Sequence, residues 1–339
     1  MKIFLVLALC IFGCSGSPKV SKQEGTPQWI DNPQVEYPKS EYVVVVGVGD
    51  NYDDAQKSAF SKISSIFKTE VSVSGKVIDE YKQVLSSFSQ DVEVEKSLSK
   101  NEITTKSQET LLNVKFGKSF SANDGRVYVI AYLDRDETAT IYRQKINSNK
   151  RAIEFYLDEK SDELILQFAF LKAAYTISKV NQMLTSQLQI ISSSSKIPEA
   201  TSNSHSQIAI YMERLRNRIG FAITVDGDRD KKVKSIISKI VNSLGFPITS
   251  TPLFEIASKV SVSEADLQKK NQVFYNWEIS ISLSDEKDRV VFSSYEKGRD
   301  GGLNQTSALD KVYNQIEKRL NNTIERELEE YLFSFYSKK

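Results

Sequence analysis

The order of hydrophobic patterns most constrains the fold of this 339-residue chain, because the same order occurs twice. In the first block, a β-branched apolar run at residues 42–46 precedes apolar residues at helical spacing across 52–67. In the second block, an apolar run at 221–225 precedes a helical pattern at 232–244. Each block continues with segments typical of strands and ends in a helix. The chain is therefore predicted to be an α+β protein with two domains, each a mainly antiparallel sheet covered by helices in the order β-α-β-β-β-α.

The rest of the first block contains strand patterns of unequal strength. Alternating apolar residues predict a strand at 69–77, and apolar segments at 111–120 and 126–133 predict an antiparallel pair. A helix is expected from Glu137. The polar stretch 79–108 alternates only weakly, so it is interpreted either as an extended hairpin or as a mobile excursion.

The rest of the second block follows the same order. A short strand is predicted at 247–251, and an antiparallel hairpin at 273–283 and 289–294. A long final helix carries apolar residues at helical spacing between Leu309 and Leu332.

The two blocks are predicted to be joined by a long helical segment. Residues 151–191 keep helical spacing with one slip in phase, which fits a packed pair of helices or one curved helix over a sheet. A partner-binding coiled coil is the alternative, although the heptad is not sustained. Residues 192–207 are rich in serine and contain a proline, which is typical of a linker. This division gives an N-terminal domain at 29–150 and a C-terminal domain at 208–339.

The start of the chain has the pattern of a secretory signal. A basic start precedes an apolar run at residues 3–12, and Cys14 follows Gly13. The run is too short to span a bilayer core, which needs about twenty residues. The segment resembles a bacterial lipoprotein signal, in which the cysteine after a small residue is lipidated and becomes the mature N-terminus. Residues 1–13 are therefore predicted to be the signal peptide and Cys14 the lipid attachment site.

Two alternatives to this assignment are weaker. An ordinary cleaved signal would favour an A-x-A-like ending, and the other cysteine, Cys10, follows the bulky Leu9. The polar segment 14–28 predicts a flexible tether after the acylated cysteine. Ser15, rather than aspartate, follows Cys14, which in the enterobacterial sorting rule favours the outer membrane. The lipid would then hold the protein on the periplasmic face or at the cell surface.

Composition excludes several classes of function. Once Lys2 is removed with the signal, 44 of the 45 basic residues remain against 44 acidic residues, so no clustered positive charge is expected to bind nucleic acid. Cys10 lies in the signal and Cys14 at the lipid site, so no disulfide is expected. His205 is the single histidine, too few for a Cys/His zinc site, and it is interpreted as an exposed linker residue rather than a catalytic base. No metal and no cofactor are predicted.

Two short motifs resemble ligand-binding loops but are interpreted structurally. Gly47 and Gly49 lie between a strand and a helix, yet the third glycine of the dinucleotide fingerprint is missing, so they are interpreted as turn glycines. Asp226, Asp228 and Asp230 alternate as at the start of a calcium loop, but the required glycine and bidentate glutamate are missing. A turn and a helix cap are predicted there.

An acidic series on the last helix is interpreted as a solvated face. Its members are Glu325, Glu327, Glu329 and Glu330. Spacing alone nominates no pair of carboxylates as acid and base, so no catalytic residue is predicted.

Four pieces of the first block occur in the order and spacing of a known family. They are residues 27–33 (PQWIDNP), the strand at 42–46 with the glycine motif at 47–49, the alanine-bearing helix behind it, and residues 127–135 (VYVIAYLDR). Over residues 27–147 the chain resembles the LPP20 family of bacterial outer-membrane lipoproteins. The resemblance implies a surface or envelope lipoprotein without established catalytic residues, and some relatives belong to flagellar outer-membrane discs. In element order alone, the second block is similar to the α/β modules of envelope lipoproteins that activate penicillin-binding proteins or build secretion pores.

These observations lead to one main hypothesis and two alternatives. The main hypothesis is a non-enzymatic, lipid-anchored protein that binds other envelope components: peptidoglycan-synthesis machinery, a flagellar or secretion assembly, or its own copies. The 15 tyrosines and 17 phenylalanines suit a protein–protein surface. The alternatives are a periplasmic small-ligand binder and a hydrolase of envelope glycan that works with carboxylates.

Overall fold

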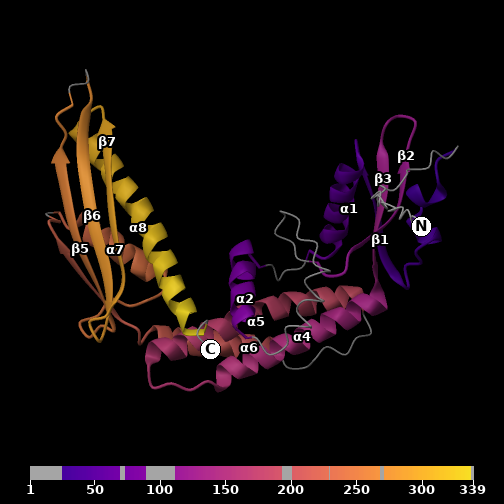
Figure 1. The fold of residues 1–339 in the computed structure, drawn as a ribbon, viewed down its shortest axis with the longest axis horizontal. Coiled ribbons are helices and arrows are strands. Elements are labelled where there is room, and N and C mark those ends of the chain that lie inside the picture. Colours follow the sequence, from indigo (N-terminus) through magenta and orange to yellow (C-terminus); the bar gives the residue numbers. More distant parts are fainter. Residues whose placement is uncertain are drawn as a thin grey trace, which may run out of the picture. The chain divides into compact units, whose positions relative to one another are not determined.

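The computed structural model describes residues 25–68, 73–88, 111–192, 201–228, 230–267 and 271–336 (Figure 1). The predicted signal peptide, Cys14 and most of the predicted tether lie outside these residues. The chain forms two compact units, each assembled from separate stretches. Unit 1 comprises Met1–Glu70, Glu93–Arg143 and Gln187–Ser195, and unit 2 comprises Val71–Val92, Gln144–Ser186 and Lys196–Lys339.

Unit 1 is built on a three-stranded antiparallel sheet. Strand β3 (Val127–Asp134) lies between β1 (Tyr42–Gly49) and β2 (Lys115–Ser121). Helix α1 (Tyr52–Ile66) packs on one face of this sheet through a row of buried small and apolar residues. The N-terminal region therefore confirms the predicted α+β class.

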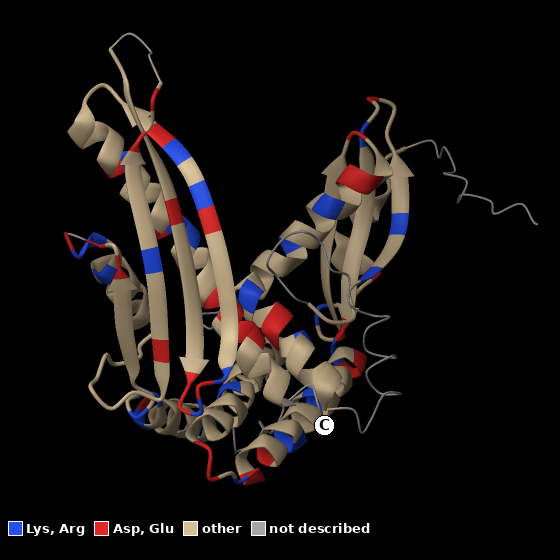
Figure 2. Cartoon of the chain, turned by 60° about the vertical axis from the view of Figure 1, so that its left-hand side comes forward, with Lys and Arg blue, Asp and Glu red and all other residues tan. Residues whose placement is uncertain are grey.

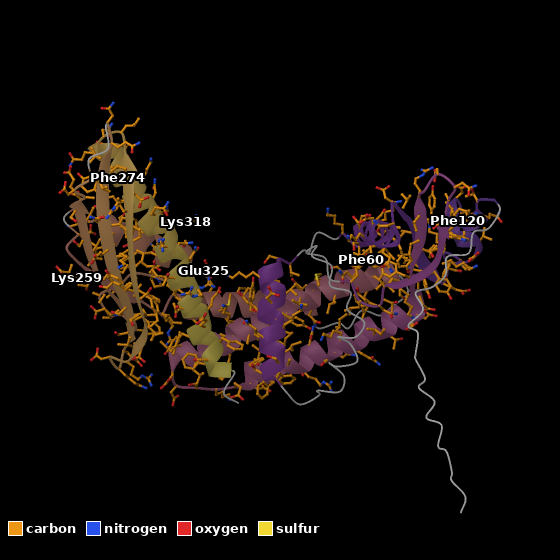
Figure 3. All side chains as sticks on the ribbon, turned by 45° about the horizontal axis from the view of Figure 1, so that its top comes forward. Phe60, Phe120, Lys259, Phe274, Lys318 and Glu325 are labelled. Atoms are coloured by element: carbon orange, nitrogen blue, oxygen red, sulfur yellow. The ribbon has the colours of Figure 1, made fainter. Side chains whose placement is uncertain are left out.

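The opposite face of this sheet is covered by residues that precede β1. Two short 3₁₀ helices, η1 (Gln28–Ile30) and η2 (Pro33–Val35), form there. Trp29 of η1 packs against Phe120, which Figure 3 labels, and against Ile130 in a buried cluster. Because both faces of the sheet are covered, β1 has a continuous apolar run instead of a strict alternation.

The glycine motif allows α1 to approach β1 closely. A β-carbon at Gly47 would lie 2.1 Å from the carbonyl oxygen of Ala55 and 2.3 Å from the backbone nitrogen of Ala59. The interpretation as turn glycines is therefore wrong, because both glycines belong to β1 and helix packing requires them. Asn51 caps α1, and its side-chain oxygen accepts a hydrogen bond from the backbone N–H of Asp54 at 2.9 Å.

The strand predicted at 69–77 is wrong where the structure describes it. Helix α2 (Gly75–Ser87) begins there, and the Ser74 side chain accepts a hydrogen bond from the backbone N–H of Val77 at 3.4 Å. The buried residues of α2 have helical spacing: Ile78, Tyr81, Val84 and Leu85. The same helix replaces the hairpin or excursion expected at the start of 79–108, and residues 89–108 lie outside the described residues. The described N-terminal sheet thus has three strands rather than four.

Three helices follow β3: α4 (Arg135–Asp158), α5 (Leu164–Ile191) and α6 (Thr201–Arg216). The break between α4 and α5 favours the predicted pair of helices over one curved helix. The linker predicted at 192–207 is wrong from the start of α6 onward. Buried apolar residues of α6 keep helical spacing: Ile208, Met212 and Leu215. Burial of this face outweighs the weak helix propensity of the serines.

The C-terminal sheet in unit 2 has four strands in the order β4-β5-β6-β7. Strand β4 (Phe221–Asp226) pairs in parallel with β5 (Phe254–Glu264). Strands β6 (Val273–Asp285) and β7 (Val290–Gly302) continue the sheet in antiparallel pairs. Helix α7 (Lys232–Ser243) connects β4 to β5, because parallel neighbours need a crossover connection.

Helices cover one face of this sheet. Helix α8 (Gln305–Tyr336) packs with α7 against the strands (Figure 1). Its buried residues follow a helical stripe: Val312, Ile316, Leu320, Ile324, Leu328 and Leu332. Charged residues of both signs lie along the strands (Figure 2). None of the helices in the described part of the chain is long and apolar enough to cross a membrane.

The element order predicted for the second block is confirmed, but the position of its second strand is wrong. That strand is β5, and the segment at 247–251 contributes an isolated bridge between Ile248 and Phe221. Alternating burial along β5, with Phe254 and Ile256 inside and their neighbours exposed, shows the period of a half-buried strand.

Candidate ligand-binding pocket

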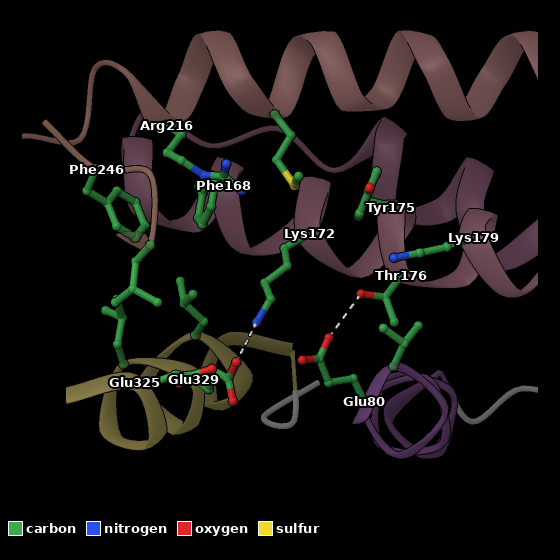
Figure 4. A pocket seen from close by; sticks show the side chains of 15 residues that line it. Glu80, Phe168, Lys172, Tyr175, Thr176, Lys179, Arg216, Phe246, Glu325 and Glu329 are labelled. Carbon is green, nitrogen blue, oxygen red and sulfur yellow. Dashed lines mark hydrogen bonds and ion pairs between the residues drawn. The ribbon is translucent and has the colours of Figure 1, made fainter. Parts of the chain in front are cut away.

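A pocket of about 210 Å³ lies within unit 2, among α2, α5, α6, α8 and the loop after α7 (Figure 4). We name it the Phe168 pocket. Its main apolar residues are Phe168, Met212, Phe246, Leu328 and Leu332. Its charged residues are Glu80, Lys172, Lys179, Arg216, Glu325 and Glu329. A largely apolar lining with a few charged groups is typical of small-ligand sites.

Helical spacing explains why these residues meet. Helix α5 contributes Phe168, Lys172, Tyr175, Thr176 and Lys179. Helix α8 contributes Glu325, Leu328, Glu329 and Leu332. Because residues three and four positions apart share a helix face, each helix lines the pocket with one stripe.

Arg216, the last residue of α6, lies at one end of the pocket. Its guanidinium carbon is 5.7 Å from the centroid of the Phe168 ring, and that ring meets the Phe246 ring at 5.6 Å. One guanidinium nitrogen donates to Glu213 at 2.8 Å, whereas Nε is buried without a hydrogen-bond partner among the described residues. Gly245 makes room for this side chain, because its φ is +83° and a β-carbon there would lie 2.8 Å from Cδ of Arg216. The pocket lining therefore includes a buried donor that lacks an acceptor.

Lys76 of α2 neutralises two carboxylates at the rim of the pocket. Its ammonium group pairs with Glu325 and lies 2.9 Å from Glu329, and Lys172 lies 4.0 Å from Glu329. Burial lowers the pKa of Lys76, but hydrogen bonds to the two carboxylates outweigh burial and raise its pKa above the usual value. The prediction of a solvated face is wrong for these two glutamates. The other two members of the acidic series pair with an arginine of their own helix.

The other end of the pocket holds Glu80, Thr176 and Lys179 (Figure 4). The Thr176 hydroxyl donates to a Glu80 carboxylate oxygen at 3.5 Å. Lys179 forms no ion pair with any residue that the structure describes. The two ends thus differ in how their charged groups are paired: the guanidinium of Arg216 is paired with Glu213 through one nitrogen only, whereas Glu80 is held by the Thr176 hydroxyl.

His205 lies beside the pocket, so its interpretation as an exposed linker residue is wrong. It is half-buried on α6, its ring stacks on Tyr175 at 4.8 Å, and its Nδ1 lies 2.8 Å from the Ser178 hydroxyl. Burial, followed by the charge of Lys179, lowers the pKa of His205. Ser178 is buried and donates to the carbonyl oxygen of Tyr175 at 2.8 Å. This serine–histidine pair therefore exposes no hydroxyl to a substrate.

The motif that resembles a calcium loop forms a turn and a helix cap, as predicted. A carboxylate oxygen of Asp228 accepts a hydrogen bond from the backbone N–H of Lys234 at 2.8 Å, near the start of α7. Asp226 lies 3.9 Å from Lys259. Across the described ranges, no group of three or more histidine, cysteine, aspartate or glutamate residues is arranged to hold a metal ion.

The Phe168 pocket is the site that the sequence did not predict. Its lining comes from helices that are far apart in the chain, two of which, α2 and α6, were not expected. One local signal exists on α5, where Lys172 and Lys179 are the two charged residues of the helix and lie on the same face as Phe168 and Tyr175. Cys14, the lipid site that the sequence did predict, lies outside the described residues.

Comparison with known proteins yields no family assignment. No family model matches the chain, so the likeness to the LPP20 family remains an expectation. No curated protein matches it either.

Three solved structures show distant likeness. The secreted protein HP1454 from Helicobacter pylori has 12% sequence identity and a TM-score of 0.44, with 84% of this chain and 97% of that chain covered. The rare lipoprotein B from Shewanella oneidensis has 7% identity and a TM-score of 0.24, with 33% and 92% covered. A minor lipoprotein from Acinetobacter baumannii has 7% identity and a TM-score of 0.21, with 35% and 91% covered. These scores are too low to carry a functional argument.

Proposed function

We propose that this chain is a lipid-anchored protein of the bacterial cell envelope that binds other envelope components and does not act as an enzyme. The observation that carries the proposal is Cys14, which follows Gly13 and an apolar run too short to span a bilayer. Each buried methylene contributes about 0.8 kcal/mol, so one acyl chain holds a protein marginally and several chains hold it firmly. Ser15 after the cysteine favours the outer membrane.

The charged groups of the Phe168 pocket support binding over catalysis. Glu325 and Glu329 are held by Lys76, and His205 is stacked and hydrogen-bonded beside the pocket. A general acid or base must reach the substrate with a proton to give or take. Glu325, Glu329 and His205 are instead engaged with neighbouring side chains of the protein.

An exposed strand edge supports a protein partner. Strand β7 is at the edge of its sheet, and large apolar side chains are exposed along it and just beyond it. They are Val290 (64% exposed), Tyr295 (57%) and Leu303 (78%). Sheet edges pair readily with other chains, and exposed aromatic residues are enriched at interfaces. The proposed partner is another envelope protein or a second copy of this chain.

The anchor is tested by Cys14→Ala, with Cys10→Ala as the matched control. In cells supplied with radiolabelled palmitate, we expect Cys14→Ala to lose the label and to leave the membrane fraction. Cys10→Ala should keep both the label and the membrane location. Unchanged labelling of Cys14→Ala would contradict the anchor.

The partner surface is tested by photo-crosslinking in live cells. A photoreactive amino acid at Tyr295 should give discrete crosslinked products, whereas the same group at the exposed Lys318 of α8 should not. Equal, diffuse products at the two positions would argue against a specific partner at β7.

A further inference from the structure

The size of the Phe168 pocket sets the size of what it can hold. Its volume is about 210 Å³, and an apolar cavity of about 150 Å³ is known to take up benzene. An aromatic ring or a short acyl chain therefore fits, but a whole lipid does not. The rings of Phe168 and Phe246, with Leu328 and Leu332, supply the apolar contacts for such a group.

The charged side chains of the pocket determine whether a bound ligand is an anion or a cation. Glu325 and Glu329 already have Lys76 as a partner, so a cationic ligand would compete with an existing ion pair. The guanidinium of Arg216 also has a partner, Glu213, but its Nε is buried and has no acceptor among the described residues. A buried donor without an acceptor is unfavourable, and an anion that reaches it removes that penalty.

The position of Arg216 decides the orientation of the ligand. Its guanidinium group lies over Phe168 at the end of the pocket opposite Glu80 (Figure 4). Glu213 occupies one nitrogen of the guanidinium, so an anionic group at this end is bound through the free Nε and stays away from the Glu80 carboxylate. Arginine suits carboxylates and phosphates because its planar group donates several hydrogen bonds in a fixed geometry.

We infer that the Phe168 pocket binds a small amphipathic anion: a ring or short acyl chain that carries one carboxylate or phosphate group, with this group at Arg216. The inference rests on the pocket within unit 2 and does not depend on the lipid anchor.

The test uses the full chain in phospholipid nanodiscs, with empty nanodiscs as the blank, and isothermal titration calorimetry. 4-Phenylbutyrate and phenyl phosphate are the anionic probes, and 4-phenylbutylamine has the same ring with a positive charge. We expect at least one anionic probe to bind about tenfold or more tightly than the amine, and inorganic phosphate alone to bind no better than the amine. The stronger of the two anionic probes identifies whether the site prefers a carboxylate or a phosphate.

Substitutions in unit 2 test whether the probe binds in the Phe168 pocket. Arg216→Gln should weaken binding of the preferred probe about tenfold, whereas Arg214→Gln, an exposed arginine on the same helix, should leave it unchanged. Met212→Trp should fill the pocket and abolish binding, with circular dichroism confirming that each variant is folded. The comparison of the three aromatic probes uses the unaltered chain, so it does not depend on whether a variant folds. Equal affinity for anion and amine, absence of binding, or an unchanged affinity in a folded Arg216→Gln variant would each overturn the inference.

Discussion

A substitution at Asn181 tests how helices α4 and α5 are held together. Its side chain is fully buried, donates to the carbonyl oxygen of Ile146 at 3.3 Å, and accepts a hydrogen bond from the Asn149 amide at 3.1 Å. Asn149 in turn accepts a hydrogen bond from the hydroxyl of Tyr81 at 2.8 Å. The network therefore joins α2, α4 and α5, and both α2 and α5 line the Phe168 pocket.

We expect Asn181→Leu to destabilise this packing although leucine is the more apolar residue. Greater apolar burial favours the leucine by about 1.5 kcal/mol. Against this, the buried Asn149 amide loses its acceptor, which costs about 1–3 kcal/mol. The Ile146 carbonyl keeps its bond within α4 but loses its side-chain donor, which costs about 0.5–1.5 kcal/mol more. The net loss in the free energy of local opening is about 2 kcal/mol.

Hydrogen exchange of backbone amides measures this loss directly, because it reports local opening without requiring the whole chain to unfold in one step. A loss of about 2 kcal/mol corresponds to about 30-fold faster exchange of the protected amides in α4 and α5. Ile177→Leu, a fully buried site on the same helix, is the matched control, since swaps that conserve volume cost less than about 1.5 kcal/mol. Exchange in Asn181→Leu at or below the rate of the unaltered chain would refute the reasoning.

Two other substitutions test other parts of the fold. Gly47→Ala should destabilise unit 1 by at least about 2 kcal/mol, since its β-carbon would overlap the backbone of α1. A β-carbon at Gly75 would meet nothing within 4 Å, so Gly75→Ala should be neutral or stabilising. Equal thermal stability of the two variants would contradict this account. His205 has a folded pKa below its unfolded value of about 6.5, so protonation favours the unfolded state and stability falls as pH drops through that value. His205→Gln should therefore lose less stability than the unaltered chain between about pH 7 and pH 5, and parallel pH profiles from thermal melts would count against the burial of this ring.

The elements that the sequence predicted correctly are those with unbroken apolar spacing. In α1 and α8 the buried residues keep helical spacing from end to end, and β1 is an uninterrupted apolar run, so local pattern and tertiary packing agree. The order of elements in the second block could be predicted for the same reason.

The missed elements have interrupted patterns. In β5, the inward-facing Ser258 breaks the apolar series, and its hydroxyl is satisfied by the carbonyl oxygen of Ser280 at 2.8 Å. In α6, the serines suggested a linker, although Ile208 and Met212 lie one turn apart and are buried. A polar residue that finds a partner in the fold cannot be distinguished, in the sequence, from one that faces water.

The pocket could not be predicted because no local pattern encodes it. Its lining runs from Val77 to Leu332 and depends on how four helices pack. The unpaired Nε of Arg216 depends on Gly245, which is 29 positions away in sequence. Such a contact becomes visible only when the helices are placed in space.

The most direct test of the central claim is mass spectrometry of the N-terminal peptide of the protein isolated from membranes. The proposed function predicts a mature chain that begins at Cys14 and carries three acyl chains on that residue. A chain that begins elsewhere, or that begins at Cys14 without lipid, would contradict the proposal.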